Sequence, residues 1–236
     1  MVSDDRAPRT RLLDAMRRPA SNREIGIVLG IPIALSLASA ILWHLRSPGA
    51  VIFSNPNVVL SLAIQVAIAG CMLPYLYRRH WKPLEIAGVP DVRDVARGLG
   101  LWLGVIGFFY MTMIALYLAA PGLIWSLRSH PPFSGSLAAP VIVAAAILDP
   151  VFEEFLLLGY AVPALGNRFG IKTAAVTSVV VRVAAHAYQG RLAFIAILPV
   201  ALILTFYFVR TGRLWPVIVA HIVQDALALT IAFGAT

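Results

Sequence analysis

The chain has 236 residues, of which 60% are hydrophobic and only 13% are charged, and its mean hydropathy is +0.84. A soluble domain carries about 25% charged residues, so this composition excludes an ordinary soluble protein and predicts one polytopic membrane domain. The net charge of +8 does not indicate nucleic-acid binding, because Lys and Arg cluster between apolar segments, as in the cytoplasmic loops of membrane proteins.

Residues 1–23 form a basic tail, which we expect to be cytoplasmic and either flexible or lying on the membrane surface. We interpret residues 24–236 as a single transmembrane domain, an all-α bundle of about seven helices. Its apolar segments run at about 25–45, 57–77, 95–120, 137–160, 171–188, 192–209 and 214–233. A signal peptide is the alternative for the first segment, because Ala38-Ser39-Ala40 resembles a cleavage site. The apolar run continues through Trp43, however, and is long enough to span.

The distribution of basic residues predicts the orientation. Fifteen Lys and Arg residues lie in the tail and in the connections on the same side, and three lie on the opposite side. Because cytoplasmic loops carry the excess of Lys and Arg, we expect a cytoplasmic N-terminus in the plasma (inner) membrane. No sequence repeat of the kind found in many transporters is visible.

Ionisable residues are concentrated in the last four apolar segments, and the first three segments contain almost none. A charged side chain at the centre of a membrane helix costs about 2.5–3.5 kcal/mol on insertion scales, so such residues usually face a protein interior and mark a functional site. We therefore place the catalytic core at roughly 137–233. The residues concerned are Asp149, Glu153, Glu154, Arg182, His186, His221 and Asp225.

The spacing of these residues suits a helical site. Asp149 and Glu153 are four residues apart and share a helix face, as do Arg182 with His186 and His221 with Asp225. The adjacent Glu153 and Glu154 are turned by about 100° from each other, so one can face a reaction centre while the other orients a partner.

No nucleophile motif accompanies this set, because Cys71 lies in the other half of the chain. A carboxylate beside a neutral histidine can instead take a proton from water, and a second histidine with a hydrogen-bonding neighbour can stabilise an oxyanion. The pattern predicts amide hydrolysis without a covalent intermediate and without a metal cofactor.

The same residues resemble three motifs of the CPBP family of intramembrane proteases, which includes the type II CAAX prenyl endopeptidases and the bacterial Abi proteins. The first family motif is Glu-Glu, three residues, then Arg, Gly and an aromatic residue, and here it runs from Glu153 to Gly159-Tyr160. The second, Phe-x-x-x-His, is Arg182 to His186 here, and the third, His-x-x-x-Asn, is His221 to Asp225.

The resemblance implies a role for each matching residue. Glu153 would be the general base for water, Glu154 would orient or assist, and His186 would share the water. His221 and Asp225 would form the oxyanion site. The implied fold is a helical bundle with a conical intramembrane cavity, and the implied substrate is a membrane-associated or prenylated (CAAX-type) peptide or protein, with the lipid bilayer as the other partner and no nucleic acid.

Three positions depart from the motifs. Leu158 stands where the family has Arg, Arg182 where it has Phe, and Asp225 where it has Asn. The first two changes compensate each other if Arg182 supplies the cation that buried carboxylates need, so we predict that Arg182 pairs with Glu154 or Asp149. Asp149 is otherwise expected to have a supporting role.

The third departure bears on the oxyanion site, because an ionised Asp225 accepts hydrogen bonds and cannot donate one to an oxyanion as Asn does. Either Asp225 is protonated, or it holds His221 in one tautomer while His221 alone donates.

Other interpretations remain open from the sequence. Two histidines and several carboxylates could hold a divalent metal, such as zinc on Glu153, His186 and His221, although the pattern His-Glu-x-x-His is absent. The three departures also suit an inactive family member that serves as a membrane scaffold or regulator. Chains of Asp, Glu and His build proton relays in transporters as well, so a proton-coupled transporter is a further alternative.

Overall fold

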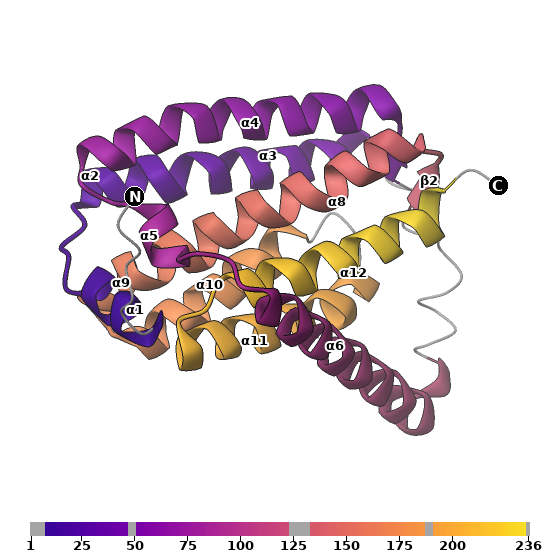
Figure 1. Ribbon diagram of the computed structural model, residues 1–236. Coiled ribbons are helices and arrows are strands. Elements are labelled where there is room, and N and C mark those ends of the chain that lie inside the picture. The colour runs from indigo at the N-terminus through magenta and orange to yellow at the C-terminus, as the bar shows by residue number, and fades with distance from the viewer. Residues whose placement is uncertain (1–7, 47–50, 123–132, 187–190, 235–236) are drawn as a thin grey trace.

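The computed structural model describes residues 8–46, 51–122, 133–186 and 191–234, and in them the chain is an all-α bundle, as predicted (Figure 1). The first half contains short helices α1 (Pro8–Met16), α2 (Asn22–Ile25) and α5 (Pro83–Ala87), the π-helix η1 (Gly26–Gly30), and long helices α3 (Ile31–Arg46), α4 (Asn55–Arg78) and α6 (Val92–Ala119). The second half contains α8 (Ala139–Glu154), the π-helix η2 (Phe155–Ala161), α9 (Val162–Phe169), α10 (Ile171–Ala185), α11 (Arg191–Thr211) and α12 (Trp215–Phe233).

Each of the seven predicted apolar segments coincides with helix in the described residues. Four helical stretches there are long and apolar enough to cross a membrane, namely Asn22–Ser39, Asn55–Arg78, Val92–Ala119 and Trp215–Phe233. A shorter apolar helix covers Ile195–Thr211. The chain is therefore a polytopic membrane protein, whereas the number of seven spans stays a prediction. The fourth segment carries three carboxylates and changes to π-helix after Glu154, so it does not form one long apolar helix.

Proline and acidic caps set where several of these helices begin. Pro56, Pro140 and Pro216 lie in the first turns of α4, α8 and α12, where the missing N–H has no helical partner to lose. Helix α6 begins with a capping box in which Asp91 and Asp94 exchange side-chain to backbone hydrogen bonds. These starts define the ends of the bundle.

Helices α6 and α12 pack closely and support the C-terminal half. A Cβ atom at Gly98 of α6 would lie 2.6 Å from the Val219 side chain, so only glycine permits this approach. The buried Asp94 accepts hydrogen bonds from Arg97 at 3.1 Å and from Arg213 at 2.9 Å, and this ties the start of α6 to the turn before α12. The position of His221 on α12 is thereby fixed relative to the rest of the bundle.

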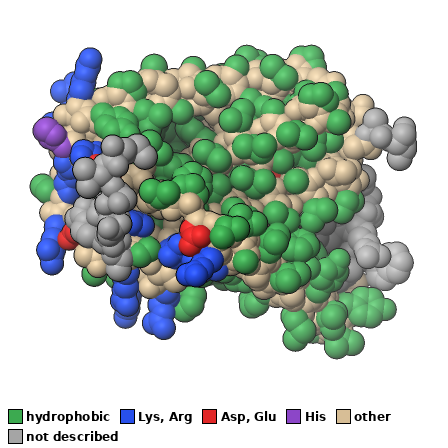
Figure 2. Space-filling model, in the orientation of Figure 1, with side chains coloured by type: hydrophobic (Ala, Val, Ile, Leu, Met, Phe, Trp, Pro, Cys, Tyr) green, Lys and Arg blue, Asp and Glu red, His purple; other side chains and the backbone are tan. Residues whose placement is uncertain are grey.

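The bundle has one basic end, formed by α1, α5 and the adjacent ends of α4, α9 and α11 (Figure 1). Lys and Arg side chains gather at this end, whereas hydrophobic side chains cover most of the remaining visible surface (Figure 2). The opposite end carries a small parallel pair of strands, β1 (Val51–Phe53) and β2 (Phe133–Gly135), beside the end of α12. A basic end beside an apolar surface suits a membrane-spanning molecule.

Part of the basic N-terminal tail forms helix α1, which packs against the bundle. Leu12 is 2% exposed and lies in a core cluster with Ala87 and Phe208. The helix packs against three glycines from distant segments. Gly88 faces the Arg11 guanidinium, Gly166 faces Met16, and Gly212 faces the Pro8 backbone. Residues 1–7 of the tail lie outside the described part of the chain.

We expect Gly212→Ala to loosen α1. Gly212 has φ +69°, and a Cβ atom there would lie 2.4 Å from the Pro8 carbonyl oxygen, so the substitution adds a collision to a backbone penalty of about 1–2 kcal/mol. Trypsin should then cleave at the arginines of α1 faster than in wild type. Gly170→Ala is the matched control, because φ is +81° there but nothing lies within 4 Å of the added atom. Equal cleavage of both variants would show that the close contact does not hold α1.

Candidate functional site

The centre of the site is a buried ion pair between α8 and α10. Glu154 is the last residue of α8, and its side chain is fully buried. Arg182 binds it in a bidentate manner, with Nη1 2.6 Å from Oε1 and Nη2 2.7 Å from Oε2. Such paired, charge-assisted hydrogen bonds are the strong form of carboxylate recognition. The structure thus contains the predicted pair of Arg182 with Glu154.

Helix α12 brings His221 to the same carboxylate. Its Nδ1 lies 2.6 Å from Glu154 Oε1. Because an ionised carboxylate only accepts hydrogen bonds, Nδ1 carries the proton in this contact. Nε2 therefore faces the remaining acidic groups, Glu153 and Asp225, and can donate to a further group only when the ring is an imidazolium.

Glu153 and Asp225 lie around this buried centre and are more accessible. The side chain of Glu153 is 20% exposed, with Oε1 3.6 Å from Arg182 Nε and Oε2 3.9 Å from His221 Nε2. Asp225 Oδ1 is 3.6 Å from the same Nε2, and its side chain is 29% exposed. Arg182 Nε is buried and has no hydrogen-bond partner among the described residues. These separations are too long for direct hydrogen bonds and suit bridging by water.

His186 caps the C-terminal end of α10, one turn after Arg182. Its Nδ1 lies 2.8 Å from the Arg182 carbonyl oxygen, which can only accept, so Nδ1–H donates and Nε2 of the neutral ring holds the lone pair. The His186 ring lies within electrostatic range of Asp225. The residues that follow, 187–190, lie outside the described part of the chain.

Asp149 lies one turn before Glu153 and contacts a residue that the sequence analysis did not identify. Gln65 of α4 donates a hydrogen bond from Nε2 to Asp149 Oδ1. Asp149 also interacts electrostatically with Glu153, Asp225 and His221. The only signal for Gln65 in the sequence is that it is a polar side chain inside an otherwise apolar segment. Asp149 pairs with an amide, and the cation Arg182 goes to Glu154.

The π-helix η2 begins directly after Glu154, and π-helical turns are frequent at functional sites. Ser178 of α10 donates from its hydroxyl to the Leu157 carbonyl oxygen at 3.3 Å, which is a further tie between η2 and α10. Leu158 is fully buried in the core cluster with Leu204 and Leu214. An apolar contact therefore occupies the motif position of Arg, and the cation comes from the neighbouring helix.

All seven predicted polar residues thus come together where α8, α10 and α12 meet. Among the residues that the structure describes, no three His, Cys, Asp or Glu side chains form a group that could hold a metal ion. The Arg182 guanidinium supplies positive charge between the two glutamates. The arrangement can hold a water beside a carboxylate, with a histidine donor nearby.

Comparison with known proteins identifies a matching family. Residues 135–227 match the family model described as type II CAAX prenyl endopeptidase, Rce1-like. The matched segment begins in β2 and ends in α12, so it contains every residue of the site except Gln65. No curated protein and no solved structure matches the chain.

Proposed function

We propose that this chain, which belongs to the CPBP family through its Rce1-like domain, is an intramembrane endopeptidase that hydrolyses a peptide bond of a membrane-associated or prenylated substrate. The family is one of CAAX-type proteases, and the activity of this chain is the proposal. One observation carries it: a fully buried Glu154–Arg182–His221 cluster lies beside the accessible carboxylate of Glu153. A purely structural network would not need Glu153, which forms no direct hydrogen bond with Arg182 or His221.

In the proposed mechanism, Glu153 is the general base. It takes a proton from a water, the hydroxide oxygen attacks the carbonyl carbon of the scissile bond, and the carbonyl π electrons move to the oxygen. Glu153 then returns its proton to the amine as the carbon–nitrogen bond breaks. Arg182 and Glu154 hold the geometry, since the bidentate pair fixes both helices. His186 shares the attacking water through Nε2.

His221 is the proposed donor to the oxyanion. With Nδ1–H donated to Glu154, the ring must be an imidazolium to donate from Nε2 as well. The carboxylates of Glu153, Glu154 and Asp225 surround it and favour that charged form electrostatically. Asp225 then acts through His221, as an acceptor that keeps the ring charged and oriented.

Asp225→Asn tests this assignment. The substitution removes one of the three carboxylates that favour the charged ring, but it supplies the amide donor found in the family motif, which can bind the oxyanion directly, so we expect cleavage to be retained. Asp225→Ala removes the acceptor and supplies no donor in its place, and we expect it to lower kcat by roughly tenfold or more, as for loss of an oxyanion-stabilising group. The measurement is kcat with a fluorogenic membrane peptide. Asn and Ala variants with equally low kcat would contradict an amide donor at this position.

The activity itself is tested with purified protein in detergent and a panel of peptides, each with and without a prenyl group. Cleavage by wild type, its loss in His186→Ala, and preference for the prenylated member of a pair would support the proposal. We also propose a mechanism without a metal cofactor. Activity that is lost with a chelator and restored by zinc would replace it with a metal site on Glu153, His186 and His221.

Two alternatives give different results in these experiments. A regulatory scaffold would bind membrane peptides without cleaving any of them, in wild type as in the variants. A proton-coupled transporter would acidify or alkalinise proteoliposomes when its solute is added, and His186→Ala would abolish that flux. The buried Arg182–Glu154 pair favours hydrolysis over proton transport. A proton relay needs a carboxylate that can take up and release protons, whereas the charge of Glu154 is neutralised by Arg182.

The basic end is proposed to face the cytoplasm of a plasma (inner) membrane, with the N-terminus on that side. The Lys and Arg side chains gathered there support this orientation (Figure 2). Labelling of an engineered cysteine at position 17, directly after α1, where the Arg17 side chain is 84% exposed, tests it in intact cells. Reaction with a membrane-impermeant reagent from outside would reverse the assignment.

A further inference from the structure

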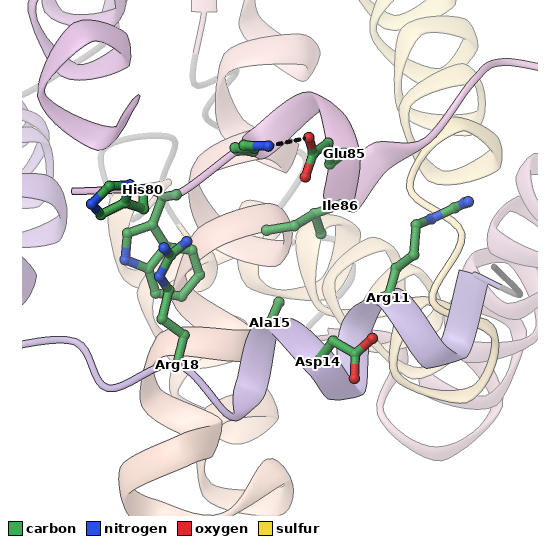
Figure 3. Close-up of a pocket in the computed structure, with 9 residues that line it drawn as sticks. Arg11, Asp14, Ala15, Arg18, His80, Glu85 and Ile86 are labelled. Atoms are coloured by element: carbon green, nitrogen blue, oxygen red, sulfur yellow. Dashed lines mark hydrogen bonds and ion pairs between the residues drawn. The ribbon is translucent and has the colours of Figure 1, made fainter. Parts of the chain in front are cut away.

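A charged pocket of about 180 Å³ lies at the basic end, away from the proposed catalytic residues. It is enclosed by α1 and the residues after it on one side, and by the connection from α4 into α5 on the other (Figure 3). Arg11 and Arg18 rise from the first side, and His80, Glu85 and Ile86 lie opposite. Nothing in the proposed mechanism uses this pocket.

Among the described residues, the guanidinium of Arg18 in this pocket has no carboxylate partner. Glu85 is paired with Lys82 at 2.7 Å, and Asp14 is paired with Arg17 at 3.6 Å. Arg18 instead places its guanidinium over the Trp81 ring, 5.5 Å from the ring centroid, and forms no ion pair with any described carboxylate. An arginine stacked by its face keeps its edge N–H groups for a planar or tetrahedral anion.

The backbone turn after α4 also shapes the pocket. Helix α4 ends in a Schellman turn, in which Trp81 N–H donates to the Leu76 carbonyl oxygen at 2.8 Å and His80 N–H donates to that of Tyr77 at 2.9 Å. His80 takes the left-handed position, φ 61°, that glycine usually occupies there. This turn directs Trp81 inward, where it is 1% exposed, and keeps an imidazole at the rim.

The pocket lies at the end of a candidate membrane span. Its residues His80, Trp81 and Lys82 follow directly on α4, one of the helices long and apolar enough to span, and Arg78 and Arg79 precede them in the chain. Anionic lipid surfaces attract such basic segments with about 1 kcal/mol per Lys or Arg. An anion at this place is therefore most readily the phosphate of a lipid.

We propose that this pocket binds the phosphate of an anionic phospholipid headgroup, with Arg18 as the principal donor and Lys82 and Arg11 as flanking cations. Bound lipid would hold the segment after α1 against Trp81. Trp81 in turn contacts Tyr160 of η2 edge to face, at 5.0 Å between centroids, and the Tyr160 hydroxyl donates to Glu24 at 3.1 Å. The lipid therefore stabilises the segment that directly follows Glu154.

The test uses purified full-length protein in a neutral detergent and does not involve peptide cleavage. Short-chain phosphatidylglycerol, phosphatidylcholine with the same acyl chains, and inorganic phosphate are titrated separately, and binding is followed by the thermal midpoint and by calorimetry. We expect phosphatidylglycerol to raise the midpoint and to bind more tightly than either of the others. Arg18→Gln should weaken that binding roughly tenfold or more, as loss of a charge-assisted hydrogen bond predicts.

Arg9→Gln is the matched control, because it removes the same charge from an exposed residue of α1 that does not line the pocket. Lys82→Gln is a second variant if Arg18→Gln does not fold. Equal binding of phosphatidylcholine, or equal weakening by Arg9→Gln, overturns the proposal. Inorganic phosphate that binds as tightly as the lipid overturns the lipid as its source. Neither result depends on whether the protein is a protease.

Discussion

Glu153→Gln is expected to lower the rate of peptide hydrolysis by about 10²–10⁴-fold while the protein stays folded. An amide matches the shape of the carboxylate but cannot take the proton of water. Among the described contacts, the nearest cationic atom to the Glu153 carboxylate is Arg182 Nε, at 3.6 Å, which is too far for a direct hydrogen bond. We therefore expect the fold to depend little on the charge of Glu153. The measurement is kcat on a cleaved peptide together with the thermal midpoint in detergent.

Glu154→Gln provides the contrast. Glu154 is fully buried and accepts three short hydrogen bonds, so its neutral analogue should lower the thermal midpoint and the activity together. A Glu153→Gln protein that cleaves at nearly the wild-type rate would move the general base elsewhere, and His186 would be the next candidate. If Glu153→Gln lost as much stability as Glu154→Gln, the two glutamates would have to share the structural role.

Arg182→Met is expected to cause the largest loss of stability in the molecule, about 3–5 kcal/mol, because it leaves Glu154 buried without its cation. Cleavage should be lost with it. In this variant, a protonated His221 would be the cation left in contact with Glu154 among the described residues. The measurement is the thermal midpoint of the purified protein. Arg182→Lys keeps the charge but not the planar fork, so it should recover stability only in part.

The double variant Glu154→Gln/Arg182→Met separates the pair from its two members. Removing both charges avoids an uncompensated buried ion, so the double variant should be more stable than Arg182→Met alone, although inactive. An Arg182→Met protein as stable as wild type would mean that the pair contributes little. In that case the family's motif Arg, which is Leu158 here, would have no functional replacement on α10.

The ion pair was predictable because burial of charge in a membrane is so costly. Arg182 is the one Lys or Arg far from the ends of the apolar segments, since Arg97 and Lys172 lie within three residues of a segment start, and three carboxylates lie on another segment, so electrostatics alone restricts its partners. Gln65 escaped prediction for the converse reason. An uncharged amide costs far less to bury than a charge, and nothing in its local sequence points toward Asp149.

The helices were predictable from hydropathy, but two features were not. The residues after Glu154 are nearly all apolar, so no polar face marks the change from α- to π-helix. Helix α1 lies in an arginine-rich part of the sequence, and it packs against Gly88, Gly166 and Gly212, which are far apart in the chain. Only the tertiary packing brings these glycines together.

The π-helix η2 has a consequence for how the chain can be changed by insertion and deletion. A π-turn holds an additional residue, so α9 is rotated by roughly 100° from where a continuous α-helix would place it. Deleting one residue from η2 could restore regular winding while leaving the hydropathy profile almost unaltered. The glutamates upstream and Tyr160 downstream would then fall out of phase, and no substitution at either end would correct it.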